Sequence, residues 1–175
     1  YGVRRILELE KIFLYLCYHD GGILEIIMGA SKSANQKLST ADHAMHRELS
    51  TIWLDVDRDP DTRVALIRGE GKGFSAGGDL EWVAGMVGNP KEIANTMTEA
   101  SDVVYNMMAC DKPIISAING VAVGAGLAVA FLADISIMAE EAKITDGHVK
   151  IGVAAGDHAA ILWPLLCGMA KAKYY

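Results

Sequence analysis

Two glycine-rich segments, each placed between a predicted strand and a predicted helix, constrain the fold of this chain more than any other feature. The first, GEGKGFSAGGDL at residues 69–80, carries five glycines in twelve positions, and the second is Gly124-Ala125-Gly126. Glycines leave the backbone bare, and the first turn of a helix presents unpaired N–H groups. Such segments suit a phosphate, a nucleotide or a carbonyl oxygen that becomes an oxyanion.

Short β-type runs alternate with helical patterns along the chain. Asp20-Gly21-Gly22 is a hairpin signal between the first two runs. The predicted strands are 13–19, 23–28, 63–68, 113–118, 134–138 and 143–145. This alternation predicts an α/β fold whose ligand sites lie where strand ends meet helix starts.

Helical spacing of apolar residues predicts a first long helix over 40–56, capped by Ser39 or Thr40, and a second over 90–109. A short helix begins at Asp79, another follows the second glycine segment, and a last helix begins near Ala159 and contains Trp163-Pro164. The predicted apolar stripe of the 90–109 helix is Ile93, Met97, Ala100, Val104, Met107 and Met108.

Composition excludes several classes of protein. The chain has 175 residues and a formal net charge of −6, which is unsuited to nucleic-acid binding. Cys17, Cys110 and Cys167 lie far apart among apolar residues, which indicates reduced core thiols in a cytoplasmic compartment. The apolar stretch 121–133 is too short to span a membrane. No domain boundary is evident, so a single domain is expected.

The glycine segments leave several functions open. If their strands are neighbours, one amide from each loop can form an oxyanion hole for an acyl carbonyl. GAGLAV fits a dinucleotide fingerprint only loosely, because Val129 stands where the third small residue belongs. A P-loop is excluded, because Gly71-Lys72 is followed by Gly73. Close strand–helix packing is the simplest alternative for either loop alone.

Two motifs together resemble the crotonase (enoyl-CoA hydratase/isomerase) superfamily. GKGFSAGGDL resembles the family's G-x-x-F-(S/C/A)-A-G-x-D-(L/I) loop, and KPIISAINGVAVGAGLAVAFLAD resembles its K-P…G-G-G…D segment. A looser likeness follows in GHVKIGVAAGDHAAILWPLLCG, and the resemblance covers most of residues 13–175.

The resemblance implies a crotonase-like spiral of ββα units with a mostly parallel sheet, assembled as a homotrimer or hexamer. It implies an acyl-CoA thioester substrate, as in fatty acid metabolism, with coenzyme A as part of the substrate and no other cofactor or metal. Members of the family continue with further helices, so the single domain at 1–175 is expected to lack the C-terminal helical region.

The resemblance also assigns site residues. The oxyanion-hole amides are those of Gly78 and Ala125, and Met86 is expected in the acyl pocket. The expected substrate contacts are Ala34, Asn35, Ala76, Gly78, Asp79, Leu80, Trp82, Val123 and Ala125.

The acid–base positions depart from the family pattern. Where hydratases carry two glutamates, this chain has Ala128 and His148. We expect His148 and Asp157 to replace them, with Asp146 nearby, although Asp157 and His158 also suit a helix start.

Other polar side chains near the motifs have simpler expected roles. His43 and His46 are three residues apart on the first long helix, and we expect them to lie on a solvated face. Ser75 is expected to be a structural hydroxyl.

Three functional hypotheses follow. The first is an enoyl-CoA hydratase/isomerase-type enzyme that forms a thioester enolate, with true hydration doubtful because of Ala128 and His148. The second is a non-catalytic acyl-CoA-binding paralogue. The third is a nicotinamide-dependent oxidoreductase built on GAGLAV.

Overall fold

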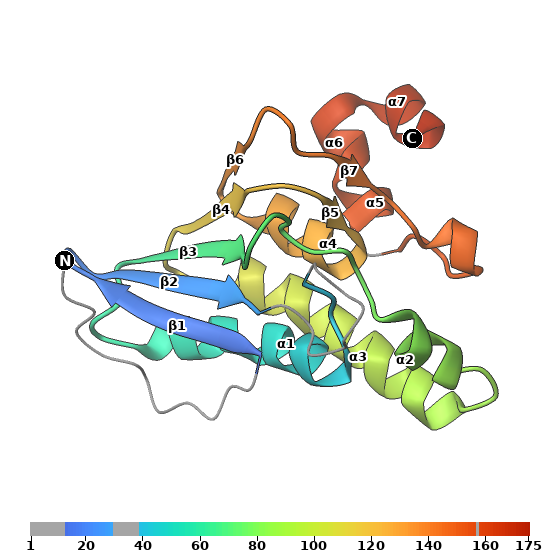
Figure 1. Ribbon diagram of the computed structural model, residues 1–175, viewed down its shortest axis with the longest axis horizontal. Coiled ribbons are helices and arrows are strands. Elements are labelled where there is room, and N and C mark those ends of the chain that lie inside the picture. Colours follow the sequence, from blue (N-terminus) through green and yellow to red (C-terminus); the bar gives the residue numbers. More distant parts are fainter. Residues whose placement is uncertain (1–12, 30–38, 157) are drawn as a thin grey trace.

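The computed structural model describes residues 13–29, 39–156 and 158–175 (Figure 1). The strands are β1 (Leu14–His19), β2 (Ile23–Met28), β3 (Val64–Gly69), β4 (Ile114–Ile118), β5 (Ala122–Val123), β6 (Ile135–Met138) and β7 (Ile144–Thr145). The helices are α1 (His43–Arg58), α2 (Leu80–Gly85), α3 (Pro90–Met108), α4 (Gly124–Leu132), α5 (His158–Ile161), α6 (Trp163–Cys167) and α7 (Met169–Tyr174), with a 3₁₀ turn, η1 (Val149–Ile151).

The main sheet has five strands in the order β1-β2-β3-β4-β6. The β1–β2 hairpin is antiparallel, and every other pair in the sheet is parallel. The strands β5 and β7 form a second parallel pair, and single bridges Ser75↔Ala122 and Ala41↔Gly78 continue that layer. The predicted α/β fold with a mostly parallel sheet is therefore confirmed. After each of β2, β3, β4 and β6, the chain contributes a short segment to the second layer.

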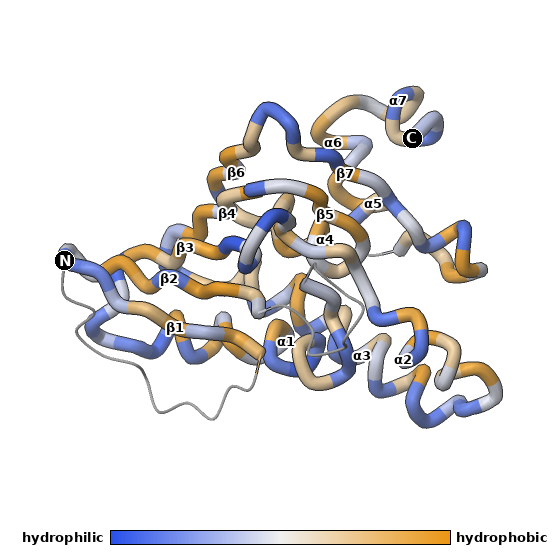
Figure 2. Tube along the Cα trace, viewed as in Figure 1, coloured by the Kyte–Doolittle hydropathy of each residue, from blue (hydrophilic) through white to orange (hydrophobic). Residues whose placement is uncertain are grey.

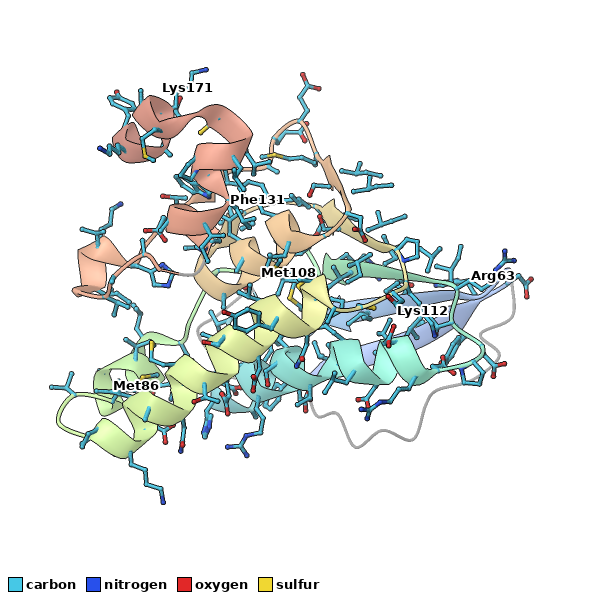
Figure 3. All side chains as sticks on the ribbon, turned by 180° about the vertical axis from the view of Figure 1, so that it is seen from behind. Arg63, Met86, Met108, Lys112, Phe131 and Lys171 are labelled. Atoms are coloured by element: carbon cyan, nitrogen blue, oxygen red, sulfur yellow. The ribbon has the colours of Figure 1, made fainter. Side chains whose placement is uncertain are left out.

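The core is formed by the main sheet together with α1, α3 and α4, and α3 packs against both other helices. In Figure 3 α1 and α3 lie side by side across the strands, and Figure 2 shows the hydrophobic runs of the strands. Ile26, Ile67, Ile52 and Trp53 have no exposed surface. Each large apolar side chain buried in this way contributes about 1.5–3 kcal/mol. None of the helices formed by the described residues is long and apolar enough to cross a lipid bilayer.

The start of α1 corrects the sequence prediction. Asp42, and neither Ser39 nor Thr40, caps the helix, since its Oδ1 accepts a hydrogen bond from the Met45 amide at 2.9 Å. Ser39 is fully buried instead and lies with its Oγ 3.8 Å from the sulfur of Met45. The segment before α1 pairs with the first glycine loop, so the helix begins three residues later than local pattern alone predicts.

The apolar stripe predicted for α3 is a core face only in part. The buried residues of the helix are Thr96, Val103 and Met107. Ile93, Met97 and Met108 are 42%, 49% and 71% exposed. Only one side of α3 meets α1, and part of the predicted stripe borders the cavity described below.

The C-terminal helix is also not continuous. It is divided into α5, α6 and α7, with Pro164 in the first turn of α6 and Gly168 at the next break. All three cysteines are free, but Cys167 is exposed and is not a core residue. The physical reason is that α6 and α7 leave most of their apolar side chains on the surface.

The start of α4 lies so close to the first glycine loop that position 126 has no room for a side chain. A Cβ placed on Gly126 would lie 2.2 Å from the Cβ of Ser75 and 2.5 Å from its Oγ. Contacts below about 3 Å require one partner to move, which is costly for a Cβ fixed to a loop backbone. Gly126 is therefore required for packing, and Ser75, which is 1% exposed, is the structural residue that we expected.

We predict that Gly126→Ala destabilises the fold by about 1–3 kcal/mol in urea unfolding, because the new methyl group overlaps Ser75. Gly85→Ala is the matched control: a Cβ at this exposed helical glycine has no heavy atom within 4 Å. Its free energy of unfolding should be unchanged or slightly increased. Adding Ser75→Gly should recover part of the free energy of unfolding lost in Gly126→Ala. If the two substitutions change that free energy in a strictly additive way, this explanation is contradicted.

Candidate functional site

A cavity of about 400 Å³ opens where the two glycine segments meet. Its lining combines backbone from both loops with mostly apolar side chains of α2 and α3. Of the residues expected at the site, it includes Ala76, Gly78, Leu80, Trp82, Met86, Val123, Ala125 and His148. Met97, Ala100 and Val104 also line it, which explains why this part of the apolar stripe of α3 is not buried in the core.

The two glycine loops are in direct contact. Their parent strands β3 and β4 are parallel neighbours, as the sequence analysis required. The Val123 amide donates to the Ser75 carbonyl at 2.9 Å. A Cβ on Gly124 would lie 3.5 Å from the Cα of Gly77 and 4.0 Å from the amide nitrogen of Gly78. The backbones that follow both strands therefore form one wall of the cavity.

The hydrogen-bond pattern orients the amide of Gly78. Ala41 receives the Asp79 N–H at 2.9 Å and donates to the Gly77 carbonyl at 2.8 Å. In this parallel pairing the N–H of the residue between them points away from Ala41. Ala125 is the second residue of α4, where helical amides have no intrahelical acceptor. Within the described part of the chain, neither the Gly78 nor the Ala125 N–H has a hydrogen-bond partner.

Asp79 holds α2 rather than lining the cavity. Its Oδ1 accepts hydrogen bonds from the amides of Glu81 and Trp82, both at 3.0 Å. This capping confirms the predicted helix start, and it places Trp82 in the cavity wall. A substrate contact for Asp79 remains a prediction.

His148 lies beside a carboxylate that sequence reasoning had placed only nearby. Its Nδ1 is 2.6 Å from Oδ1 of Asp146, the length of a charge-assisted hydrogen bond. His158 Nε2 is 3.5 Å from the same oxygen, and the two imidazole rings lie 5.6 Å apart. His158 is the first residue of α5, as expected, but its side chain is fully buried beside Asp146 and is not solvated.

Asp146, His148 and His158 could also hold a cation. Each offers one ligand atom, and these atoms lie within 4.8 Å of one another. Two imidazoles and a carboxylate suit a divalent transition metal. The 2.6 Å contact between His148 and Asp146 is already that of a hydrogen-bonded pair, and we interpret the cluster in that way.

His46 departs from the expected solvated face of α1. It is 5% exposed and lines the cavity, and its Nδ1 is 2.9 Å from Oε2 of Glu99 on α3. His43, at the surface, stacks on Trp82 with ring centroids 5.9 Å apart. The sequence missed this cluster, since Glu99 is 53 residues from His46 and reaches it only through the packing of α3 on α1.

The hydratase-type position in α4 carries no acid–base group. Ala128 is 3% exposed, and it is not among the described residues that line the cavity. Ala34, Asn35 and Asp157, also expected at the site, lie outside the described residues. Their roles therefore stay predictions.

Comparison with known proteins identifies the relatives of the chain. The family model described as enoyl-CoA hydratase/isomerase matches residues 20–175. A 1,2-epoxyphenylacetyl-CoA isomerase of Escherichia coli (strain K12) is 30% identical over 148 residues, 83% of this chain and 56% of that protein. An (E)-benzylidenesuccinyl-CoA hydratase of Thauera aromatica is 36% identical over 123 residues, 69% of this chain and 46% of that protein. The chain thus spans about half the length of these relatives.

Solved structures agree with the family model. An enoyl-CoA hydratase/isomerase from Mycobacterium paratuberculosis has a TM-score of 0.85 at 32% identity, with coverage of 93% of this chain and 64% of that chain. An enoyl-CoA hydratase from Shewanella pealeana ATCC 700345 has the same fold, with a TM-score of 0.84 at 23% identity over 95% of this chain and 61% of that chain. The expected crotonase-type fold is confirmed, and the chain belongs to the enoyl-CoA hydratase/isomerase family.

Proposed function

We propose that this chain acts on an acyl-CoA thioester by forming an enolate, whose oxygen is bound by the amides of Gly78 and Ala125. The observation that supports the proposal is the contact between the two glycine loops, together with the presence of Gly78 and Ala125 in the lining of one cavity. The two curated relatives support the substrate class, because both are named for reactions of CoA esters.

The two amides would favour the enolate over the thioester. Removing a proton from the carbon beside the carbonyl puts negative charge on one oxygen, and fixed donors bind that charge more strongly than the neutral carbonyl. Each donor of this kind contributes about 3 kcal/mol to the transition state. No rearrangement of the donors is needed, because Gly77 and Gly124 already have the positive φ angles, 88° and 55°, that the two turns require.

His148 supplies the base. With its Nδ1–H donated to Asp146, the neutral imidazole carries its lone pair on Nε2. Nε2 takes the proton from the α-carbon, the C–H electron pair forms the C=C bond of the enolate, and the carbonyl electrons move to the oxygen. Asp146 stabilises the resulting imidazolium.

Proton transfer, rather than hydration, fits the residues present. The position of one hydratase glutamate is the buried Ala128, so no carboxylate there can activate water. Movement of a double bond needs only removal and return of a proton. The nicotinamide alternative gains no support, because Gly126 is used for packing on Ser75.

The expected homotrimer or hexamer belongs to this proposal. The edge strand β6 leaves Ile135, Ile137 and Met138 exposed by 52%, 61% and 44%. An apolar sheet edge of this kind is a surface that association with another copy would cover.

We predict that replacing Ala125 by lactic acid, which exchanges its N–H for an ester oxygen, lowers turnover of the best enoyl-CoA substrate by about 10²- to 10³-fold. The change removes one donor and keeps the methyl group. Unnatural-residue incorporation followed by steady-state kinetics measures the effect.

The same exchange at Ala170 is the control. Ala170 is also the second residue of a helix, α7, but is exposed and lies outside the cavity lining. Equal kinetics for both ester variants and the unmodified protein would contradict the assignment of Ala125.

A second prediction concerns the base. His148→Gln should lower exchange of the α-proton of a saturated acyl-CoA with D₂O by about 10²- to 10⁴-fold, because the imidazole is lost. Binding of the ester, measured by calorimetry, should change little. His19→Gln, at a surface histidine paired with Glu25 at 2.7 Å, is the control. Undiminished exchange in His148→Gln would exclude His148 as the base, and binding without exchange in the unmodified protein would favour a non-catalytic paralogue.

A further inference from the structure

We propose that His46, held by Glu99, is a second proton-transfer group of the cavity and works together with His148. The inference rests on the proposed enolate chemistry and extends it to a residue of α1. His46 and His148 come from segments about a hundred residues apart in the chain, and both line the cavity that holds the two loop amides.

The position of His46 is tightly defined. Its side chain is 7% exposed and that of Glu99 is 12% exposed. Oε2 of Glu99 lies 2.9 Å from His46 Nδ1, and Oε1 accepts a hydrogen bond from Arg47 Nε at 3.2 Å. Both carboxylate oxygens are therefore engaged, and the carboxylate cannot rotate away from the imidazole.

Glu99 is the hydrogen-bond partner of His46 Nδ1. Burial raises the pKa of Glu99, but hydrogen bonds from His46 and Arg47 outweigh it, so the net shift is downward. Glu99 is consequently ionised at neutral pH, and its oxygen accepts the Nδ1–H of His46. With Nδ1 engaged in this way, Nε2 is the ring nitrogen that can exchange a proton with a bound molecule.

Trp82 fixes the ring from a further side. The indole lies against His46 with ring centroids 5.4 Å apart and a tilt of 52°, and it stacks on His43 at 5.9 Å. Trp82 also lines the cavity. The imidazole of His46 is thus packed in one orientation at the cavity wall, as a group that must meet a reacting carbon requires.

A second group lets each end of the shifted double bond have its own proton-transfer residue, because the two ends are different carbons. His148 takes a proton from C2 of a 3-enoyl thioester, and the electrons move through the enolate. The imidazolium of His46 then delivers a proton to C4, the C3–C4 double bond moves to C2–C3, and the carbonyl re-forms. Solvent returns the proton of His148 to His46, so no proton is gained or lost.

The experiment follows both events in one sample. The full chain is incubated with a short 3-enoyl-CoA in D₂O, and NMR measures deuterium at C2 and movement of the double bond. For His46→Gln we expect C2 exchange within about threefold of the unmodified protein, but migration slowed by about 10²-fold or more. The control is His19→Gln, at a surface histidine that pairs with Glu25 and is not among the described cavity-lining residues. It should retain both rates.

Each outcome decides the proposal. If His46→Gln moves the double bond as fast as the unmodified protein, the proposal is overturned, and His46 only connects α1 to α3. The proposed function would still stand. An unmodified chain that neither exchanges nor migrates would overturn both. Should His46→Gln unfold, Glu99→Gln replaces it, with the imidazole kept and its carboxylate partner lost. Selective loss of migration in Glu99→Gln supports the proposal, and unchanged migration overturns it.

Discussion

The close approach of two glycine-containing turns is the constraint on which the site depends. The loop after β3 and the turn into α4 touch where Gly126 meets Ser75, and any side chain at position 126 would overlap it. The backbones are equally close at Gly120, where a Cβ would lie 2.1 Å from the Lys72 carbonyl oxygen. Asn119, which follows β4, also bonds to the loop after β3, because its Nδ2 donates to the Gly71 carbonyl at 3.0 Å. The backbones of Gly78 and Ala125, the proposed donors, therefore lie beside one cavity.

Electrostatics complement this scaffold. The main carboxylates near the cavity are paired with imidazoles: Asp146 with His148, and Glu99 with His46. For Glu99 the hydrogen bonds from His46 and Arg47 hold the pKa below its ordinary value despite partial burial. In the proposed mechanism these two histidine–carboxylate pairs do the work for which the family pattern uses two glutamates, and one of them comes from α1, outside the family motifs. Proton transfer remains within reach although position 128 is alanine.

Local patterns predicted the parts of the molecule that are decided locally. The hairpin at Asp20-Gly21-Gly22, the buried strands and the helix start at Asp79 depend on residues within a few positions of one another, and all are present. The two glycine loops were recognisable because their motifs are contiguous.

Features decided by packing between distant segments were not predictable in this way. The burial of His46 depends on Glu99 and Trp82, which α3 and α2 bring to it. The cap of α1 moved to Asp42 because the preceding residues pair with the loop at Gly77. The stripe of α3 was apolar as expected, but its helical period cannot distinguish a core face from a cavity wall.

The most direct test of the central claim is a crystal structure of the full chain with an unreactive acyl-CoA thioester analogue bound. The account predicts that the carbonyl oxygen accepts hydrogen bonds from the amides of Gly78 and Ala125, each at about 2.7–3.1 Å. A carbonyl oxygen that meets neither amide, or an acyl group bound outside the cavity, would contradict it.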